Sequence, residues 1–169
     1  GLAQQPVFGV SAGVYAGLNL GSHVGDLPAA VAANRQVLTQ YCDLNLPPAW
    51  LNQVHGTTVL DLALWQGGLV DADASVSAVP GLAAVVMTAD CLPVLFCDRQ
   101  GSRVAAAHAG WRGLCDGVLE ATLAHFPAPA EVLAWLGPAI GPANFEVGGE
   151  VRAAFVGKNP QAASAFVPS

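Results

Sequence analysis

Apolar residues recur at helical intervals in three parts of the chain. One run starts after Asp26, a residue type that caps helices, and Pro28, which suits a first helical turn, and it continues to Tyr41. This pattern predicts a capped helix of about four turns that ends before Asp43. The same spacing predicts two further helices, over residues 114–126 and 147–156.

Short apolar runs bounded by Gly, Pro, Asp or Asn are typical of strands. They predict strands over residues 57–62, 74–79, 83–88, 93–97, 103–108 and 132–136. The strands and helices do not alternate regularly, so an α+β fold with mixed sheets is favoured over a doubly wound parallel sheet. At 169 residues without an internal repeat or a linker, residues 1–169 are expected to form a single domain.

Composition and charge exclude several classes of function. A hydrophobic content of 53% with 11% charged residues fits a compact globular protein. The net charge is −6 and Lys158 is the single lysine, which disfavours nucleic-acid binding. The polar and glycine-rich N-terminal stretch lacks the continuous apolar length of a membrane span. The four cysteines form no CxxC motif, which favours reduced thiols and a cytoplasmic protein.

Three short segments each place one good zinc ligand beside a turn: His55 before Gly56, Cys91 after Asp90, and His108 shortly before Gly110. Two imidazoles and one thiolate make three protein ligands, which is the number in catalytic zinc sites that keep a fourth position open. Buried packing residues are the ordinary alternative for a lone Cys or His in apolar sequence. Their place at the ends of strand-like runs, beside glycines, favours a metal site.

The same segments resemble one protein family. The matching stretches occur in the family's order: residues 9–26, Gln53-Val-His-Gly56, Asp71-Ala-Asp-Ala74, Thr88-Ala-Asp-Cys-Leu-Pro93, Ala106-Ala-His-Ala-Gly-Trp-Arg-Gly113 and Trp135-Leu-Gly-Pro-Ala-Ile-Gly-Pro142. They are similar to the laccase-domain family, once called multicopper polyphenol oxidases and regarded as zinc-dependent purine nucleoside phosphorylases with adenosine deaminase activity.

The resemblance implies a layered α/β/β/α sandwich and zinc, with copper as a second possibility, held by His55, Cys91 and His108. It implies purine nucleosides of the adenosine, inosine and methylthioadenosine type, plus phosphate, as partners. Two departures concern phosphate binding. Family members continue past Ser169, so the family's C-terminal segment is expected to be absent, and Val7-Phe8-Gly9 stands where the family has Arg-Gly-Gly.

Two residues are candidates for catalytic roles beside the ligands. Zinc lowers the pKa of a bound water, and zinc deaminases of nucleobases use a nearby carboxylate to carry the proton, a role that Asp90 can fill. Asp90 can equally orient its turn. Arg112, in a turn expected to lead into a helix near Leu114, can bind phosphate through its guanidinium. A structural salt bridge is the alternative for Arg112.

Other functions remain open at this point. Cys91 activated by His108 would make a cysteine hydrolase or amidase, and a binding module that keeps its ligands but has lost catalysis is a further alternative. Four histidines are too few for a trinuclear copper cluster with a separate copper, which argues against a copper oxidase. His23, Asp71 and Asp73 are open between local turn roles and, for the two aspartates, hydrogen bonds to ligand histidines.

Overall fold

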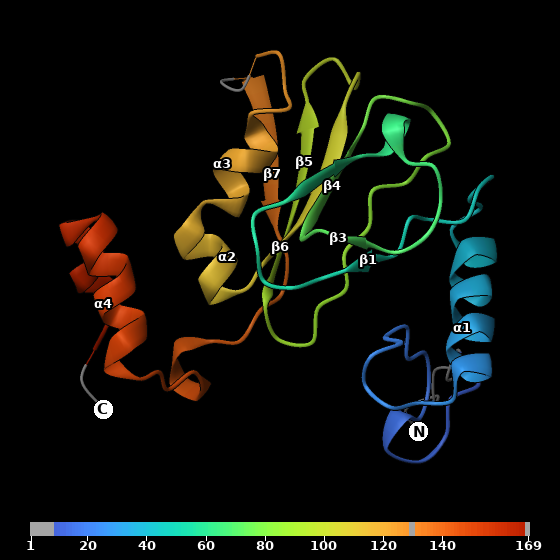
Figure 1. Ribbon diagram of the computed structural model, residues 1–169, viewed down its shortest axis with the longest axis horizontal. Helices are drawn as coiled ribbons and strands as arrows, with labels where there is room; N and C mark the ends of the chain where they lie inside the picture. Colours follow the sequence, from blue (N-terminus) through green and yellow to red (C-terminus); the bar gives the residue numbers. More distant parts are fainter. Residues whose placement is uncertain (1–8, 129–130, 168–169) are drawn as a thin grey trace, which may run out of the picture. The chain divides into compact units, whose positions relative to one another are not determined.

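The computed structural model describes residues 9–128 and 131–167, and these fall into two compact units. The first contains residues 9–48 and 81–83, and the second contains residues 49–80 and 84–167. Figure 1 shows the helices and strands of both units. The expectation of one domain over residues 1–169 therefore stays a prediction.

The first unit is built on α1 (Pro28–Tyr41), with the short 3-10 helix η1 (Gly13–Tyr15) before it. The helix begins and ends where its pattern predicts, but Leu27 caps it and Asp26 does not. The Asp26 carboxylate instead accepts hydrogen bonds from the Ser11 hydroxyl (2.6 Å) and the Asn19 amide (3.0 Å). Both loop bonds end at Oδ2, whereas Oδ1 accepts from Leu27 N at 2.7 Å, so Asp26 ties the preceding loop to the start of the helix.

The second unit contains both sheets of the described residues. A five-stranded mixed sheet has the order β2-β4-β6-β5-β7, and a two-stranded parallel sheet pairs β1 with β3. The strands are β1 (Leu51–Asn52), β2 (Val59–Asp61), β3 (Val70–Asp71), β4 (Ala74–Ser77), β5 (Leu92–Asp98), β6 (Val104–Ala109) and β7 (Val132–Leu136). The α+β class with mixed sheets is thereby confirmed.

Helices α2 (Trp111–Asp116) and α3 (Val118–Leu123) cover one face of the larger sheet (Figure 1). That face supplies alternate residues of three central strands to the core, among them Val76, Val94 and Ala107, which meet Val118 from α3. Period-2 burial of this kind is what places an apolar run in a sheet. The remaining elements of the unit are η2 (Leu62–Leu64), η4 (Pro142–Asn144), α4 (Gly149–Lys158) and η5 (Pro160–Ala165).

The helix expected over residues 114–126 is two helices. Gly117 separates α2 from α3 in a left-handed conformation with φ +101°, and its N–H donates to Gly113 O. Glycine adopts this conformation without the steric cost that a side chain brings. The helical apolar spacing continues across the break, which is why spacing alone predicted one helix. The first helix also begins at Trp111, so Arg112 lies within it and not in a preceding turn.

The strand expected over residues 83–88 does not form, because these residues pair with no strand of the described ranges. The backbone of Met87 instead bonds a side chain: Gln53 Nε2 donates to Met87 O, and Met87 N donates to Gln53 Oε1, both at 2.7 Å. Segment 84–91 therefore runs as irregular chain from the first unit to Cys91, directly before β5.

All four cysteines are free, as expected for reduced thiols. Among the described residues, no helix combines the length and the apolar character that crossing a membrane requires.

Candidate metal centre

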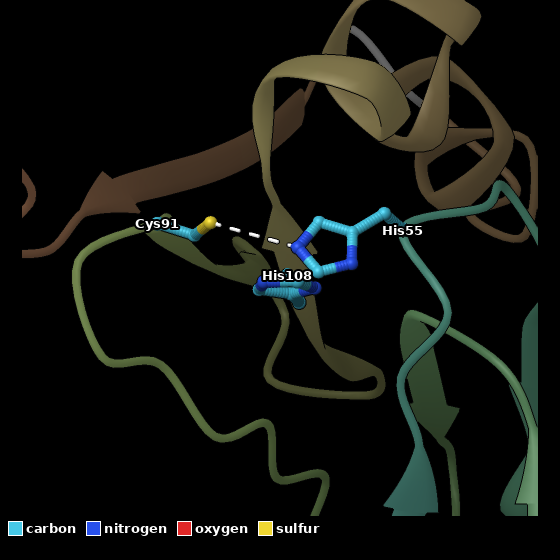
Figure 2. Close-up of side chains that lie close together, drawn as sticks. All are labelled: His55, Cys91 and His108. Atoms are coloured by element: carbon cyan, nitrogen blue, oxygen red, sulfur yellow. Dashed lines mark hydrogen bonds between the residues drawn. The ribbon is translucent and has the colours of Figure 1, made fainter. Parts of the chain in front are cut away.

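The side chains of His55, Cys91 and His108 converge in the second unit (Figure 2). One ligand atom from each residue lies within 4.8 Å of the other two. His55 belongs to the loop after β1, Cys91 immediately precedes β5, and His108 lies near the end of β6. Cys91 and His108 follow His55 by 36 and 53 positions in the sequence, and the fold brings the three together as the sequence predicts. Their role as metal ligands stays a prediction.

His108 is placed by the sheet. It sits opposite Pro93 in the β5–β6 ladder, its N–H donates to Asp73 O at 2.7 Å, and the residue is only 4% exposed. Its ring Nδ1 lies 2.8 Å from Asp73 Oδ1. A carboxylate accepts, so Nδ1 carries the hydrogen and Nε2 keeps its lone pair for another partner.

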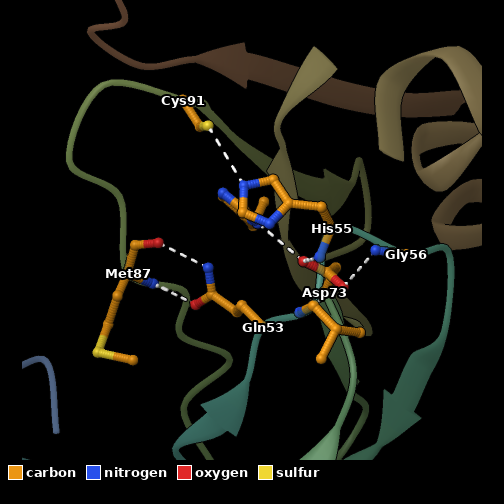
Figure 3. A network of polar contacts seen from close by, with 8 residues as sticks. Gln53, His55, Gly56, Asp73, Met87 and Cys91 are labelled. Atoms are coloured by element: carbon orange, nitrogen blue, oxygen red, sulfur yellow. Dashed lines mark hydrogen bonds and ion pairs between the residues drawn. The ribbon is translucent and has the colours of Figure 1, made fainter. Parts of the chain in front are cut away.

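Asp73 is the centre of the polar network around the site (Figure 3). It is fully buried, and besides His108 it accepts the backbone N–H groups of Val54 (3.1 Å), His55 (2.9 Å) and Gly56 (2.7 Å). Burying a carboxylate is costly unless it is well hydrogen-bonded, and four donors satisfy that condition. One side chain thus holds both the turn that carries His55 and the ring of His108.

His55 occupies a left-handed conformation with φ +60°, which is uncommon for a residue with a side chain. The three N–H groups bound to Asp73 hold the turn in this shape. The ring meets that of His108 edge-on, with centroids 4.7 Å apart. As a result, His55 Nε2 points toward Cys91 (Figure 2).

Cys91 Sγ lies 3.9 Å from His55 Nε2. Burial raises the pKa of the Cys91 thiol, and the negative charges of Asp90 and Asp73 add to the effect. Gly110 makes room for both side chains, since a Cβ at that position would lie 2.5 Å from His55 Cδ2 and 3.1 Å from Cys91 Sγ. The close approach of three chain segments therefore depends on a glycine at 110.

The donor set fits a zinc ion. Two imidazole nitrogens and one sulfur are common zinc ligands, and ligand atoms around tetrahedral zinc are about 3.5 Å apart, given bonds of about 2.0–2.3 Å. The Sγ–Nε2 distance of 3.9 Å is close to that value. Sulfur and imidazole ligands also bind copper. Among the described residues this is the one group of its kind, so nothing in them provides for a multicopper cluster.

The two predicted catalytic residues lie beside the ligands in the sequence, but neither joins the network. Asp90 is exposed, and its carbonyl accepts from Ile140 N at 2.8 Å. Arg112 is exposed, with its guanidinium carbon 5.2 Å from the Trp111 ring centroid, and it makes no ion pair with any described residue. Both catalytic roles stay predictions, and the salt bridge considered for Arg112 is absent among those residues.

Of the two aspartates left open by the sequence, Asp73 bonds a candidate ligand and Asp71 does not. Asp71 is exposed and accepts from the Asn52 amide at 2.7 Å. Gln53 entered the sequence analysis only as part of a motif, and its link to Met87 was missed. A side-chain amide that bonds a segment 34 residues away leaves no local periodicity to detect.

Comparison with known proteins gives consistent matches. Residues 4–169 match the family described as multi-copper polyphenol oxidoreductase laccase. The chain is 59% identical over 162 residues to purine nucleoside phosphorylase PA4543 of Pseudomonas aeruginosa, covering 95% of this chain and 65% of that protein. It is 56% identical over 160 residues to purine nucleoside phosphorylase YfiH of Escherichia coli, covering 94% and 66%.

The fold has solved counterparts. The crystal structure of the Neisseria meningitidis protein NMB0706 is similar with a TM-score of 0.90 at 55% identity, over 95% of this chain and 66% of that one. The chain spans 65–66% of the length of these relatives.

Proposed function

Because the chain belongs to the multi-copper polyphenol oxidoreductase laccase family, we propose that it carries the metal centre of a zinc-dependent purine nucleoside phosphorylase that also deaminates adenosine. The observation that carries the proposal is the convergence of His55, Cys91 and His108. The names of the Pseudomonas and Escherichia relatives support the phosphorylase activity. They do not mention zinc or deamination, which rest on the donor set and on the resemblance described above.

His55 and His108 would hold the ion through ring nitrogens, and Cys91 through its sulfur. Zinc bound in this way supplies a Lewis acid and lowers the pKa of a bound water. The protein's own contribution is to fix the three donors. Asp73 accepts from His108 Nδ1 and from the N–H groups of the His55 turn, and one ligand atom from each of the three residues lies within 4.8 Å of the other two.

In deamination, water replaces the amino group at C6 of adenosine and ammonia leaves. We propose that an Asp90 carboxylate oxygen takes the proton from the water and returns it to the departing nitrogen. Support for this role is its position next to Cys91 and its exposure, which leaves the carboxylate open to substrate.

In phosphorolysis, a phosphate oxygen forms a bond to C1′ of the ribose as the bond to the purine breaks, giving the free base and ribose 1-phosphate. We propose that Arg112 binds the phosphate. Its guanidinium is exposed, lies four residues after His108, and has no carboxylate partner among the described residues. Stacking on Trp111 leaves the N–H groups at its edge available to an anion.

A cysteine hydrolase is less well supported. The neighbour of Cys91 at 3.9 Å is His55, and the raised pKa of the thiol favours the protonated form, which is a poor nucleophile. The free cysteines support the cytoplasm as the compartment. We also propose that residues 1–169 act as a single domain.

The test combines metal analysis with product analysis. Purified protein should contain zinc, and adenosine should yield inosine and ammonia without phosphate, and adenine with ribose 1-phosphate when phosphate is added. A full-length relative serves as the positive control, because this chain spans 65–66% of such proteins. Bound zinc without turnover here, beside turnover by the relative, would identify this chain as a metal-binding module. Absence of any metal would contradict the proposal.

A further inference from the structure

The segment that delivers Cys91 has no strand partner among residues 9–128 and 131–167, although its Asp90 carbonyl accepts from Ile140 N at 2.8 Å. Residues 84–91 are irregular up to the start of β5 at Leu92. Backbone N–H and C=O groups in such a segment still require hydrogen-bond partners where they are half-buried, as Met87 is. At Met87, both groups are bonded by one side chain, that of Gln53.

Gln53 replaces one link of a β-ladder. A primary amide offers a donor and an acceptor side by side, as a peptide group does. Its Nε2 donates to Met87 O and its Oε1 accepts from Met87 N, both at 2.7 Å (Figure 3). The paired distances are those of strong neutral hydrogen bonds. The two segments are thus joined at one defined register without forming a strand pair.

The joined segments are those that carry two of the three converging side chains. Gln53 lies two residues before His55, and Met87 lies four residues before Cys91. His108 needs no such link, because the β5–β6 ladder and Asp73 already fix it. The Asp73 bonds fix the turn at residues 54–56 but make no contact with segment 84–91 in the network of Figure 3.

We propose that Gln53 is a positioning residue that holds segment 84–91 against the His55 turn and thereby sets the place of the Cys91 thiol. The role in metal binding rests on the function proposed above, whereas the link between the segments does not. Gln53 touches neither an ion nor a substrate in this scheme. It acts through the backbone of Met87.

The test uses Gln53→Met, which keeps the side-chain length but removes both polar groups. The control is Asn52→Leu, which removes the neighbouring carboxamide whose bond goes to exposed Asp71. Hydrogen exchange by mass spectrometry on the ion-free protein is expected to show faster exchange over residues 84–91 in Gln53→Met alone. Protection of β5 and β6 should be unchanged. Unchanged exchange over 84–91, or loss of protection across β5 and β6, would overturn the proposal.

A second measurement connects the link to the metal centre. Titration with Co²⁺ reports thiolate ligation through a sulfur-to-cobalt charge-transfer band. Gln53→Met is expected to bind Co²⁺ about 10- to 100-fold more weakly, with a weaker band, as for other residues that orient metal ligands. Wild-type affinity and band intensity in Gln53→Met would overturn the positioning role. Absence of the band in the wild type would instead contradict the proposed metal site, while exchange would still decide the link.

Discussion

Strand β6 and the two irregular segments around it supply the same centre, but they hold their residues differently. His108 sits in a ladder whose backbone hydrogen bonds are made regardless of side chains. Among the described residues, His55 and Cys91 lie in segments without ladder partners. Asp73 bonds the His55 turn, and the segment before Cys91 is bonded by the Gln53 side chain at Met87 and by Ile140 N at Asp90 O. The comparison teaches that the backbone positions of two candidate ligands depend on the identity of remote residues, whereas the backbone of the third is fixed by the sheet and only its ring depends on Asp73.

The largest expected effect comes from removing the Cys91 sulfur, which lies in one of the two irregular segments. Cys91→Ala should abolish most zinc binding and turnover, because only two protein ligands remain for an ion that normally takes four. Zinc content measured per protein chain checks this. Cys97→Ala and Cys115→Ala, which alter half-buried cysteines outside the group, are the controls. Equal losses in all three variants would point to general destabilisation.

The next largest effect is expected on zinc affinity when Asp73, but not the nearby Asp71, is replaced. Asp73→Asn keeps the shape but must turn its NH₂ group either toward the N–H groups of Val54 and Gly56 or toward those of His55 and His108, so at least one hydrogen bond is lost. We expect zinc affinity to fall about 10- to 100-fold. Chelator competition measures the affinity, with thermal melting recorded in parallel.

Asp71→Asn is the matched control, since Asp71 is exposed and its carboxylate accepts only from the Asn52 amide in the described residues. Its zinc affinity should equal that of the wild type. If Asp73→Asn also bound zinc like the wild type, the ladder alone would suffice and the comparison would fail.

A smaller effect is expected where the two regions meet. Gly110→Ala places a methyl group 2.5 Å from His55 Cδ2, so the imidazole must shift. Overpacking of this kind costs about 1–3 kcal/mol, which we expect to appear as roughly tenfold weaker zinc binding. Gly141→Ala is the control, because its Cβ would meet no atom within 4 Å. Isothermal titration calorimetry measures the zinc affinity of both variants. Identical affinities would show that the centre tolerates the shift of the imidazole.

The last prediction concerns Arg112, which lies outside both regions and should affect only one of the two activities. Arg112→Ala should raise the KM for phosphate about tenfold, the low end for a charged hydrogen bond worth about 1.5–3 kcal/mol, because the guanidinium is exposed. Ammonia release from adenosine should change little. Arg152→Ala, on the exposed side of α4, serves as control. A full-length relative carrying the equivalent change is used if this chain performs no phosphorolysis. Equal loss of both activities would assign Arg112 a structural role.

The sequence predicted regular helices and strands best. The bounds of β7 match the predicted strand at residues 132–136, and α1 ends at Tyr41 as expected. Regular elements carry their burial pattern in the local sequence. Residues 83–88 have the same apolar character but no partner strand, and composition does not reveal whether a partner exists. The helix break at Gly117 likewise depends on a backbone angle that spacing does not encode.

The sequence also indicated the three converging residues, because each stands beside a turn-forming residue in a recognisable motif. It left Asp73 open between a turn role and a hydrogen bond to a ligand histidine, and it did not predict the link from Gln53 to Met87. Asp73 contacts His108 across 35 residues and Gln53 contacts Met87 across 34, and neither separation has a periodic signature. Contacts made by single polar side chains over such separations follow from tertiary structure alone.

Strand β7 has a consequence for how this chain behaves in concentrated solution. It is the outer strand of its sheet, so one side of its backbone has no strand neighbour in the part of the chain that the structure describes, and Leu133, Trp135 and Leu136 are 49%, 57% and 61% exposed. An uncovered apolar edge strand is a template for pairing with another strand. Self-association of the chain should therefore increase with protein concentration. Strand β7 is the first place to introduce a lysine when preparing the chain for crystallisation or spectroscopy.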